Sequence, residues 1–384
     1  MNRIYLDNGS TSFPKAPGVS KAVCDYIDNI GVNISRGGYE EAYSAAEVVL
    51  ETREQLCRLF GSSKPENVVF TAGVTVALNI LLKGFLKPGD HVITTSMEHN
   101  AVMRPLRQLE QKGVEISLIP CRTDGTLCIE KLPEIIKENT KLVVMTHGSN
   151  VCGTVMPVEE VCQICRKSDI PVFVDSAQTG GLIPLDMEGM GIDAIAFAGH
   201  KSLLGPQGIG GFIISDKMVP LIDPLISGGT GSISHLETIP PFMPDRFECG
   251  TQNLPGIFGL HAALTFLEET GIDVIHRHEM KCTRQLIDGL LNIKGVRIAG
   301  LTSTEGRTAA LSADFENMDN AQVAFELENT YGVMTRCGLH CAPSAHKTLL
   351  TYPQGTVRFA PGFSTTEEEI EKALEAVRNI LSRS

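Results

Sequence analysis

The 384-residue chain contains no tryptophan, and only 5% of its residues are aromatic. It also lacks the uninterrupted apolar run of about 18 residues that a membrane-spanning helix needs. The opening stretch, MNRIYLDNGSTSF, has no apolar signal core and no cleavage site. We therefore expect a cytoplasmic protein that remains where it is made and has no membrane partner.

Positive charge is also scarce. The 33 Lys and Arg residues are outnumbered by 45 Asp and Glu, which gives a net charge of −12, and no basic cluster stands out. Nucleic-acid binding depends largely on cations that neutralise backbone phosphates. We therefore expect no nucleic-acid partner.

The eleven cysteines form no disulfide framework, and only one CxxC motif, Cys162–Cys165, is present. An odd number of scattered cysteines indicates free thiols in a reducing compartment. A zinc site needs two further ligands, which no second CxxC provides. Because the motif lies in an amphipathic helical pattern, we interpret Cys162 and Cys165 as core residues and expect no metal.

Short apolar strands alternate with helical patterns from about residue 65 onward. The strand patterns are NVVFTAG, DHVITTSMEHN, KLVVMTHGSN, PVFVDSAQ, IDAIAFAG and GIGGFIIS. Such alternation predicts βαβ units and a mostly parallel sheet. Several runs are continuously apolar, as expected for strands covered on both faces. The fold class is therefore α/β.

The pattern changes after about residue 255. Two long helical stretches precede a few strands and a final helix, for which we predict a capping box from Ser364 to Glu367. This part is interpreted as a smaller α+β domain. We predict a large domain over residues 15–255 and a small domain over residues 256–384, to which the N-terminal segment 1–14 belongs.

Reactive polar groups follow several of the predicted strands. His99 follows the strand beginning at HVITT, and Asn150 follows LVVMT. Two later strands end at the same edge: one leads into Asp175 and Gln178, and the other leads into His200 and Lys201. Ligands of open parallel sheets bind beyond the carboxyl ends of the strands. Convergence of four such ends favours a functional site over four unrelated hydrogen-bonded residues.

The stretch FTAGVTVALN predicts an anion site. Ala72, Gly73 and Val74 form a small-residue turn before a helix, and Thr75 lies in its first turn. Backbone N–H groups and the helix dipole there suit a phosphate, although small residues also simply permit a helix to start. The stretch lacks the GK[ST] of a nucleotide-binding loop. GPQGIGG has the wrong spacing for a dinucleotide fingerprint and precedes a strand, so hydride transfer is disfavoured.

Together these groups suit pyridoxal phosphate (PLP). This cofactor needs a lysine for its Schiff base, an acid at its pyridine nitrogen, a planar partner over its ring and a phosphate anchor. A surface lysine in a turn is the alternative for Lys201. Its place between the apolar run AIAFAG and a glycine-rich turn favours the cofactor interpretation.

The motifs also show a resemblance to a known family that extends over nearly the whole chain. They are IYLDNGSTSFP, TAGVTVALN, MEHNA, GSNVCGT, VDSAQ, GHKSLLGPQGIGG, RFECGTQN, HCAP and VRFAPGFSTTEEEI. The chain resembles the cysteine desulfurase and selenocysteine lyase branch of the class V aminotransferases, which are fold-type I PLP enzymes. The resemblance implies a homodimer with a seven-stranded sheet, PLP in the large domain and sites at the subunit interface.

Matched motif by motif, the resemblance implies a role for each strand-end residue. Lys201 is the implied Schiff-base lysine and also moves the substrate Cα proton. His99 is implied to stack on the ring and to take part in proton transfer. Asp175 pairs with the pyridinium nitrogen and Gln178 with the ring hydroxyl. Asn150 contacts the ring oxygen or the bound substrate.

The resemblance also implies which residues bind the cofactor phosphate and the substrate carboxylate. Thr75 and His200 hold the phosphate at the Ala72–Val74 turn, together with Thr251 from the partner chain. Arg358 clamps the substrate carboxylate, to which its planar fork is suited.

Cys341 is the implied nucleophile. It lies in TRCGLHCAPSAHK, a loop-like stretch that also contains Arg336, His340, His346 and Lys347. Cationic neighbours raise the thiolate fraction of a cysteine, whereas most free cysteines are simply buried. The HCAP match favours function. The implied reaction converts L-cysteine to L-alanine and leaves a persulfide on Cys341 for a sulfur-acceptor protein.

Two positions depart from the family pattern. Ala198 stands where the family has a phosphate-binding serine, which predicts weaker PLP binding by about 1 kcal/mol. Cys337 precedes Cys341 by four residues, and we hypothesise that it resolves the persulfide or protects Cys341 as a disulfide.

Three other functions stay open at this stage. One is a selenocysteine lyase acting on L-selenocysteine. Another is a different class V reaction that does not need Cys341. The last is a non-catalytic scaffold, which would need none of the predicted catalytic residues.

Overall fold

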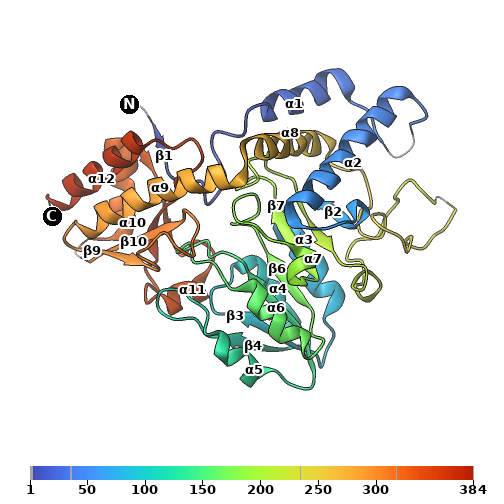
Figure 1. Ribbon diagram of the computed structural model, residues 1–384, viewed down its shortest axis with the longest axis horizontal. Helices are drawn as coiled ribbons and strands as arrows, with labels where there is room; N and C mark the ends of the chain where they lie inside the picture. Colours follow the sequence, from blue (N-terminus) through green and yellow to red (C-terminus); the bar gives the residue numbers. More distant parts are fainter. Residues whose placement is uncertain (1–2, 35–36, 234, 317, 384) are drawn as a thin grey trace.

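The computed structural model describes residues 3–34, 37–233, 235–316 and 318–383. Figure 1 shows two units, each built on a sheet, with the long helix α9 running from one unit to the other. The larger sheet has seven strands in the order β2–β8–β7–β6–β5–β3–β4. Its strands are β2 (Val68–Thr71), β3 (His91–Thr95), β4 (Glu115–Ile119), β5 (Thr140–Thr146), β6 (Val172–Asp175), β7 (Ala194–Ala198) and β8 (Gly210–Ile214).

The predicted mostly parallel sheet is confirmed. Every neighbouring pair in the larger sheet is parallel except the two that involve β8, which runs antiparallel to β2 and β7. The edge strand β4, which has exposed positions, was not among the predicted strands.

Helices cover both faces of this sheet, so its strands bury both sets of side chains. Along β5, Leu142 and Val144 enter one apolar cluster, whereas Val143 and Met145 enter the other. The first cluster includes α3 (Val74–Phe85) and α4 (Asn100–Glu110). The second includes α2 (Glu40–Phe60), α6 (Val158–Arg166), α7 (Met187–Met190) and α8 (Leu254–Thr270). The shorter helices α1 (Val19–Asp25) and α5 (Leu132–Ile135) complete this unit.

Cys162 and Cys165 lie in the core, as predicted. Both are buried on one side of α6, and burial raises the pKa of each thiol to about 12. A thiol that stays protonated in an apolar setting is a poor metal ligand and a poor nucleophile. The pair therefore serves packing.

Two adjacent glycines bring β8 against the start of α3. A Cβ on Gly210 would lie 2.8 Å from the Gly73 Cα, and one on Gly211 would meet the Val69 backbone oxygen. Side chains at these positions would push β8 away from β2 and from the turn before α3. The glycine-rich stretch therefore serves strand packing rather than nucleotide binding.

The smaller unit is built on an antiparallel sheet in the order β12–β13–β10–β9. Three helices, α9, α10 and α12, pack on it through a third apolar cluster, and β1 pairs in parallel with β11 beside it. The N-terminal strand thus contacts this unit, while the domain boundaries stay a prediction. The elements are β1 (Ile4–Tyr5), β9 (Val296–Ala299), β10 (Leu311–Phe315), α10 (Asn320–Tyr331), β11 (Val333–Met334), β12 (Arg336–Gly338), α11 (Pro343–Thr348), β13 (Thr356–Phe359) and α12 (Glu367–Leu381).

Helix α9 (Ile272–Leu291) belongs to the cores of both units. Ile275 near its start is buried in a cluster of the larger unit, whereas Cys282 and Leu286 are buried in the cluster of the smaller one. Figure 1 shows the helix running from the end of α8 to the smaller sheet. A single rigid element therefore connects the two cores.

The predicted capping box of the last helix is two residues out of place. The helix begins after Thr366, whose hydroxyl accepts the Glu369 N–H while the Glu369 carboxylate accepts the Thr366 N–H. The preceding Thr365 is instead used by the loop, since its hydroxyl accepts the Gly362 N–H at 2.9 Å. The predicted Ser364–Glu367 pair is therefore wrong.

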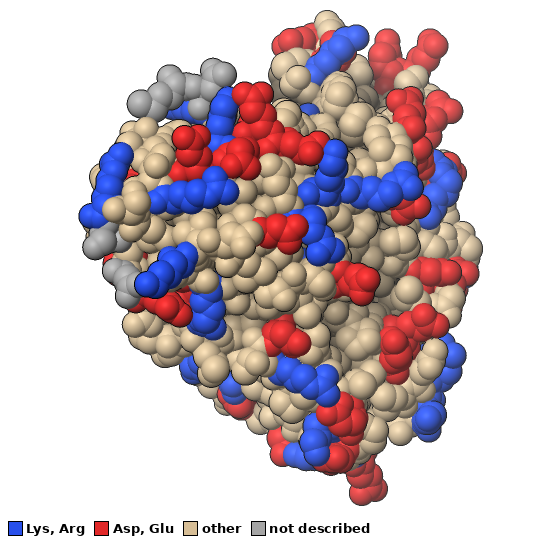
Figure 2. Space-filling view, turned by 60° about the vertical axis from the view of Figure 1, so that its left-hand side comes forward, with Lys and Arg blue, Asp and Glu red and all other residues tan. Residues whose placement is uncertain are grey.

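The surface carries charges of both signs. On the face shown in Figure 2, acidic and basic side chains are interspersed. Exposed ion pairs such as Arg58–Glu268 contribute at most about 1 kcal/mol each to stability. Within the described ranges, no helix is both long and apolar enough to cross a membrane.

Candidate active site at the carboxyl edge of the sheet

Lys201 lies three residues beyond the end of β7 and is drawn into the interior. Burial lowers the pKa of its amine from 10.5 to about 8, against the opposing effect of the Asp175 carboxylate. Asp175 ends β6, and its Oδ1 accepts the Ala177 N–H at 2.9 Å. Burial raises the pKa of this carboxyl, while Lys201 lowers it. The structure therefore brings together the predicted amine and the predicted acid.

His99 lies at the same edge and is uncharged at neutral pH. It is the N-cap of α4, and its Nδ1 accepts the Ala101 N–H at 3.0 Å. Burial lowers the pKa of His99 to about 4, and the cations Lys201 and Arg336 lower it further. A neutral imidazole fixed through Nδ1 keeps Nε2 for a ligand. This setting suits the predicted stacking and proton-transfer roles.

His200 provides a ring atom that has no partner. Its Nδ1 is buried without a hydrogen bond among the described residues, and burial lowers the pKa of the ring to about 4. Its carbonyl oxygen accepts hydrogen bonds from the side chains of Thr11, Ser12 and Lys15. The N-terminal segment thus fixes the residue beside Lys201 and leaves its ring available to a ligand.

The predicted phosphate turn has the expected local form. Gly73, at φ 149°, is the N-cap between β2 and α3, and Thr75 lies exposed in the first turn. Thr251 is also exposed, and it lines a separate surface hollow of about 530 Å³ with Tyr39 and Thr230. Within one chain the structure does not place Thr251 beside Lys201. Its predicted contribution from a partner chain stays a prediction.

Gln178 and Asn150 hold neighbouring segments together. Gln178 Nε2 donates to the Gly9 oxygen at 2.9 Å, and Asn150 Nδ2 donates to the His340 oxygen at 2.6 Å. Arg358, fully buried on β13, donates from Nη1 to the Asn150 oxygen at 2.8 Å. These contacts bring three predicted site residues to the junction of the two units.

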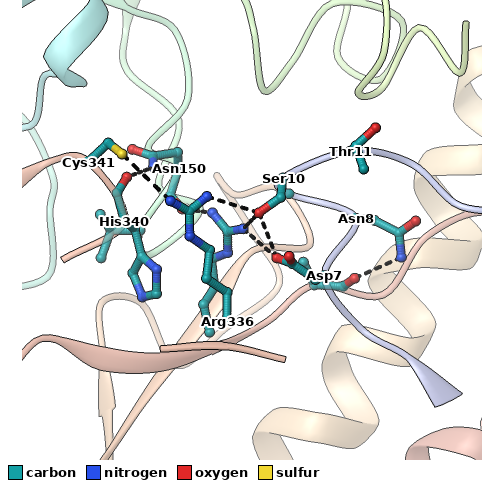
Figure 3. A network of polar contacts seen from close by, with 12 residues as sticks. Asp7, Asn8, Ser10, Thr11, Asn150, Arg336, His340 and Cys341 are labelled. Atoms are coloured by element: carbon teal, nitrogen blue, oxygen red, sulfur yellow. Dashed lines mark hydrogen bonds and ion pairs between the residues drawn. The ribbon is translucent and has the colours of Figure 1, made fainter. Parts of the chain in front are cut away.

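Cys341 is exposed on a tightly held loop. His340 and Cys341 have φ values of 47° and 59°, a left-handed conformation that costs non-glycine residues about 1–2 kcal/mol each. Their carbonyls are held in place by Asn150 Nδ2 and by the Asn100 N–H, which donates to the Cys341 oxygen at 2.8 Å. The Cys341 thiol lies 3.6 Å from Nη2 of Arg336. Figure 3 shows this contact and the loop around it.

Arg336 is the cation that contacts the thiol, and the neighbouring histidines are not charged. Burial lowers the pKa of His340 to about 2 and of His346 to about 4. Lys347 instead lies over the Tyr352 ring, 5.2 Å from its centroid. The expectation that sequence neighbours form a cationic group around Cys341 is therefore wrong, except for Arg336.

Cys337 faces away from Cys341. It lies next to Arg336 on β12, where successive side chains point to opposite faces. Cys337 packs against the apolar cluster of the smaller unit, and burial raises the pKa of its thiol. This position does not support the hypothesis that Cys337 resolves a persulfide or pairs with Cys341.

We therefore expect Cys337→Ala to leave turnover and persulfide lifetime unchanged. It should lower the free energy of unfolding by about 1 kcal/mol at most, because one partly buried sulfur is lost. Urea unfolding and single-turnover persulfide decay measure the two quantities. A shortened or prolonged persulfide lifetime would restore the hypothesis.

Several residues of the site were not among the predictions. Asp7 and Ser10 both bond to Arg358, and a Cβ on Gly9 would lie 3.0 Å from its Cζ. Glu98, next to His99, is fully buried and accepts the Thr146 N–H, and burial raises its pKa to about 8. Composition gives little signal for them, since DNGS has the composition of an ordinary turn. Both stretches do lie in motifs of the family resemblance, IYLDNGSTSFP and MEHNA.

The arrangement fits PLP. It offers a buried amine with a lowered pKa, an opposed buried carboxylate and a neutral imidazole. The unpartnered His200 Nδ1 provides a further polar contact, and buried Arg358 can receive an anion. Ala198 is buried at the end of β7, so the phosphate contact of the usual serine is absent from this chain.

Comparison with known proteins decides the family. Residues 4–373 match the model of the class-V aminotransferases. The chain belongs to this family. Its members depend on PLP, and cysteine desulfurases are among its relatives. Both the predicted family and the predicted fold class are confirmed.

Relatives at moderate identity span almost the whole chain. A probable cysteine desulfurase of Methanothermobacter thermautotrophicus is 32% identical over 99% of this chain and 95% of its own length. The apo structure of a cysteine desulfurase from Thermococcus onnurineus has a TM-score of 0.92 at 29% identity, covering 100% of this chain and 95% of that one. The cysteine desulfurase CsdA from Escherichia coli gives 0.87 at 26% identity, covering 99% and 95%.

Proposed function

We propose that the protein is a PLP-dependent cysteine desulfurase. It would convert L-cysteine to L-alanine and retain the sulfur as a persulfide on Cys341. The observation that carries the proposal is the exposed Cys341 thiol, held on a rigid loop beside Arg336 and close enough to interact electrostatically with Lys201. Three relatives with full-length similarity bear the name of this activity.

The cofactor would be held by Lys201, Asp175, His99, Gln178 and His200. When bound, it supplies a sink for the electrons released at the substrate Cα. The other phosphate contacts proposed are the Ala72–Val74 turn, Thr75 and the partner's Thr251.

Other residues of the chain would bind the substrate and transfer protons. Arg358 binds the α-carboxylate, and Asn150 contacts the bound substrate. The Lys201 amine has a pKa of about 8, so an appreciable neutral fraction is present at neutral pH to accept the Cα proton. Neutral His99 is placed for proton transfer on the other side of the site.

Sulfur transfer follows from the Cys341 thiolate. It attacks the substrate sulfur, so that the S–S bond forms while the C–S bond breaks. The electron pair of the broken bond stays on the β-carbon, which takes up a proton and becomes the methyl group of alanine. The persulfide sulfur then passes to an acceptor protein.

A homodimer is part of the proposal. The segment between β8 and α8, to which Thr251 belongs, exposes several large apolar side chains: Leu221, Leu225, Ile226, Leu236 and Phe242. Contiguous exposed apolar residues mark protein–protein contacts. A second copy that covers this segment would bring Thr251 toward its neighbour's site. Cytoplasmic location stays a prediction.

The test compares wild-type holoenzyme with Cys341→Ala. We expect alanine and sulfide from L-cysteine in the wild type, and a loss of about 100-fold or more in the variant, since no thiol accepts the sulfur. Chromatography measures alanine and colorimetry measures sulfide. Cys24→Ala, which removes an exposed thiol outside the site, is the matched control.

Other outcomes identify the alternatives. Alanine from L-selenocysteine that persists in Cys341→Ala would indicate a selenocysteine lyase. Products from another amino acid, independent of Cys341, would indicate a different class V reaction. No product from any amino acid would leave the scaffold function.

A further inference from the structure

The guanidinium of Arg358 already holds a carboxylate from its own chain. Its Nη2 donates to Asp7 Oδ1 at 2.7 Å and to Ser10 Oγ at 2.8 Å. Its Nη1 donates to the Asn150 oxygen, and its Nε is buried without a partner among the described residues. The Asp7 side chain is 21% exposed, whereas that of Arg358 is 1% exposed. Asp7 is therefore the more accessible partner of this pair.

This pairing blocks two-point binding of any other carboxylate. A guanidinium binds a carboxylate with two parallel N–H bonds, either through Nη1 and Nη2 or through Nε and Nη2. Both arrangements need an N–H of Nη2. Nη2 has two N–H groups, and Asp7 and Ser10 accept one each. An incoming carboxylate must therefore replace one of these acceptors.

Ser10 also connects Arg358 to the nucleophile. Its hydroxyl oxygen accepts from Nη2 of Arg358 and from Nη1 of Arg336 at 3.0 Å, and its proton is donated to Asp7 Oδ1 at 2.8 Å. The second nitrogen of Arg336, Nη2, contacts the Cys341 thiol. Figure 3 shows these contacts as one continuous network from Asp7 to Cys341.

We propose that Asp7 is a specificity-determining residue, an internal carboxylate that occupies Arg358 until the substrate α-carboxylate displaces it. The inference rests on the proposed function and deepens it. Amines without a carboxylate cannot make this exchange, so they leave Arg358 paired. Because Ser10 touches both guanidiniums, the exchange also alters the surroundings of the Cys341 thiol.

Charge in the site supports the exchange. The guanidiniums of Arg336 and Arg358 lie close enough to Lys201 to lower the pKa of its amine. The Asp7 carboxylate pairs directly with Arg358 and neutralises its charge. A substrate carboxylate that replaces Asp7 leaves this balance unchanged, whereas a neutral ligand would leave a buried cation unpaired. Uncompensated buried charge is strongly unfavourable.

The first test measures binding of propionate, which has a carboxylate but neither amine nor thiol. Calorimetry with holoenzyme should give a dissociation constant about tenfold lower for Asp7→Asn than for the wild type, because the internal competitor has lost its charge. Asp7→Glu keeps the charge and should bind propionate no more tightly than the wild type. Asp28→Asn, on an exposed segment, is the control for a general change in charge.

Binding that is equal or weaker in Asp7→Asn would overturn the proposal, since Asp7 would then only orient Arg358. Thermal unfolding confirms that each variant is folded. If Asp7→Asn does not fold, the affinity of Asp7→Glu for propionate still tests the proposal. If Asp7→Glu, which keeps the charge, binds propionate more tightly than the wild type, the proposal is also overturned.

The second test follows the thiol. Iodoacetamide labelling of Cys341, read by peptide mass spectrometry, should change in rate by about twofold or more when propionate is saturating. The change should disappear in Ser10→Ala, which removes the shared hydroxyl. A wild-type rate unaffected by propionate, or a response that persists in Ser10→Ala, would overturn the connection. Neither readout requires turnover, so failure of the desulfurase proposal is seen separately, as absence of alanine.

Discussion

Replacement of Lys201 by methionine should abolish amino-acid turnover, with a loss of about 1000-fold or more. Methionine has similar length and fits the partly buried position, but it has no amine to hold the cofactor or to accept a proton. Borohydride reduction followed by peptide mass spectrometry measures cofactor bound covalently to residue 201, and alanine formation measures turnover. Lys21→Met, on exposed α1, is the matched control.

The same substitution should change how the cofactor-free protein responds to pH. Burial lowers the pKa of Lys201 from 10.5 to about 8. Between these values the unfolded chain retains a proton that the folded chain has released, so stability rises with pH across this window. Lys201→Met should reduce that rise relative to the wild type. A Lys201→Met variant that still bound the cofactor covalently, or an unchanged pH dependence of urea unfolding, would contradict the assignment.

Arg307→Met should be one of the most destabilising single substitutions in the chain. Arg307 is 1% exposed and donates to the backbone oxygens of Leu301, Cys152 and Ala310 at 2.5, 3.1 and 2.8 Å. It has no carboxylate partner within the described ranges, and burial lowers its pKa to about 10. Methionine would leave these buried oxygens without donors, at a cost of about 3 kcal/mol or more.

Urea unfolding of Arg307→Met measures this loss. Arg58→Met is the matched control, because the exposed Arg58–Glu268 pair should contribute no more than about 1 kcal/mol. Arg307→Lys should recover part of the stability through fewer hydrogen bonds. A loss below about 1 kcal/mol in Arg307→Met would show that water replaces the guanidinium.

The sequence predicted the sheet and the strand-end residues well, because both depend on local patterns. Apolar runs fix the strands, and the residue after each strand of a parallel sheet must lie at the carboxyl edge. His99, Asp175 and Lys201 follow this rule. The position of Cys341 was also indicated, through its loop composition and its motif.

Contacts between distant segments could not be predicted in this way. Asp7 and Arg358 are 351 positions apart, and no periodicity links a turn near the N-terminus to β13. The contacts of Arg307 could not be predicted either, since its hydrogen-bond acceptors come from two separate loops. Proximity in sequence was misleading for His340 and His346, which are buried in the neutral form rather than exposed as cations.

Helix α9 limits how the two halves of the protein can move. Because Ile275 is anchored in one core and Leu286 in the other, the halves cannot hinge freely about a flexible connection. Opening them would require the helix to bend or one apolar cluster to separate. Ligands should therefore enter through local rearrangement of side chains, with Lys201 of the larger unit and Arg358 of the smaller unit held at a nearly constant separation.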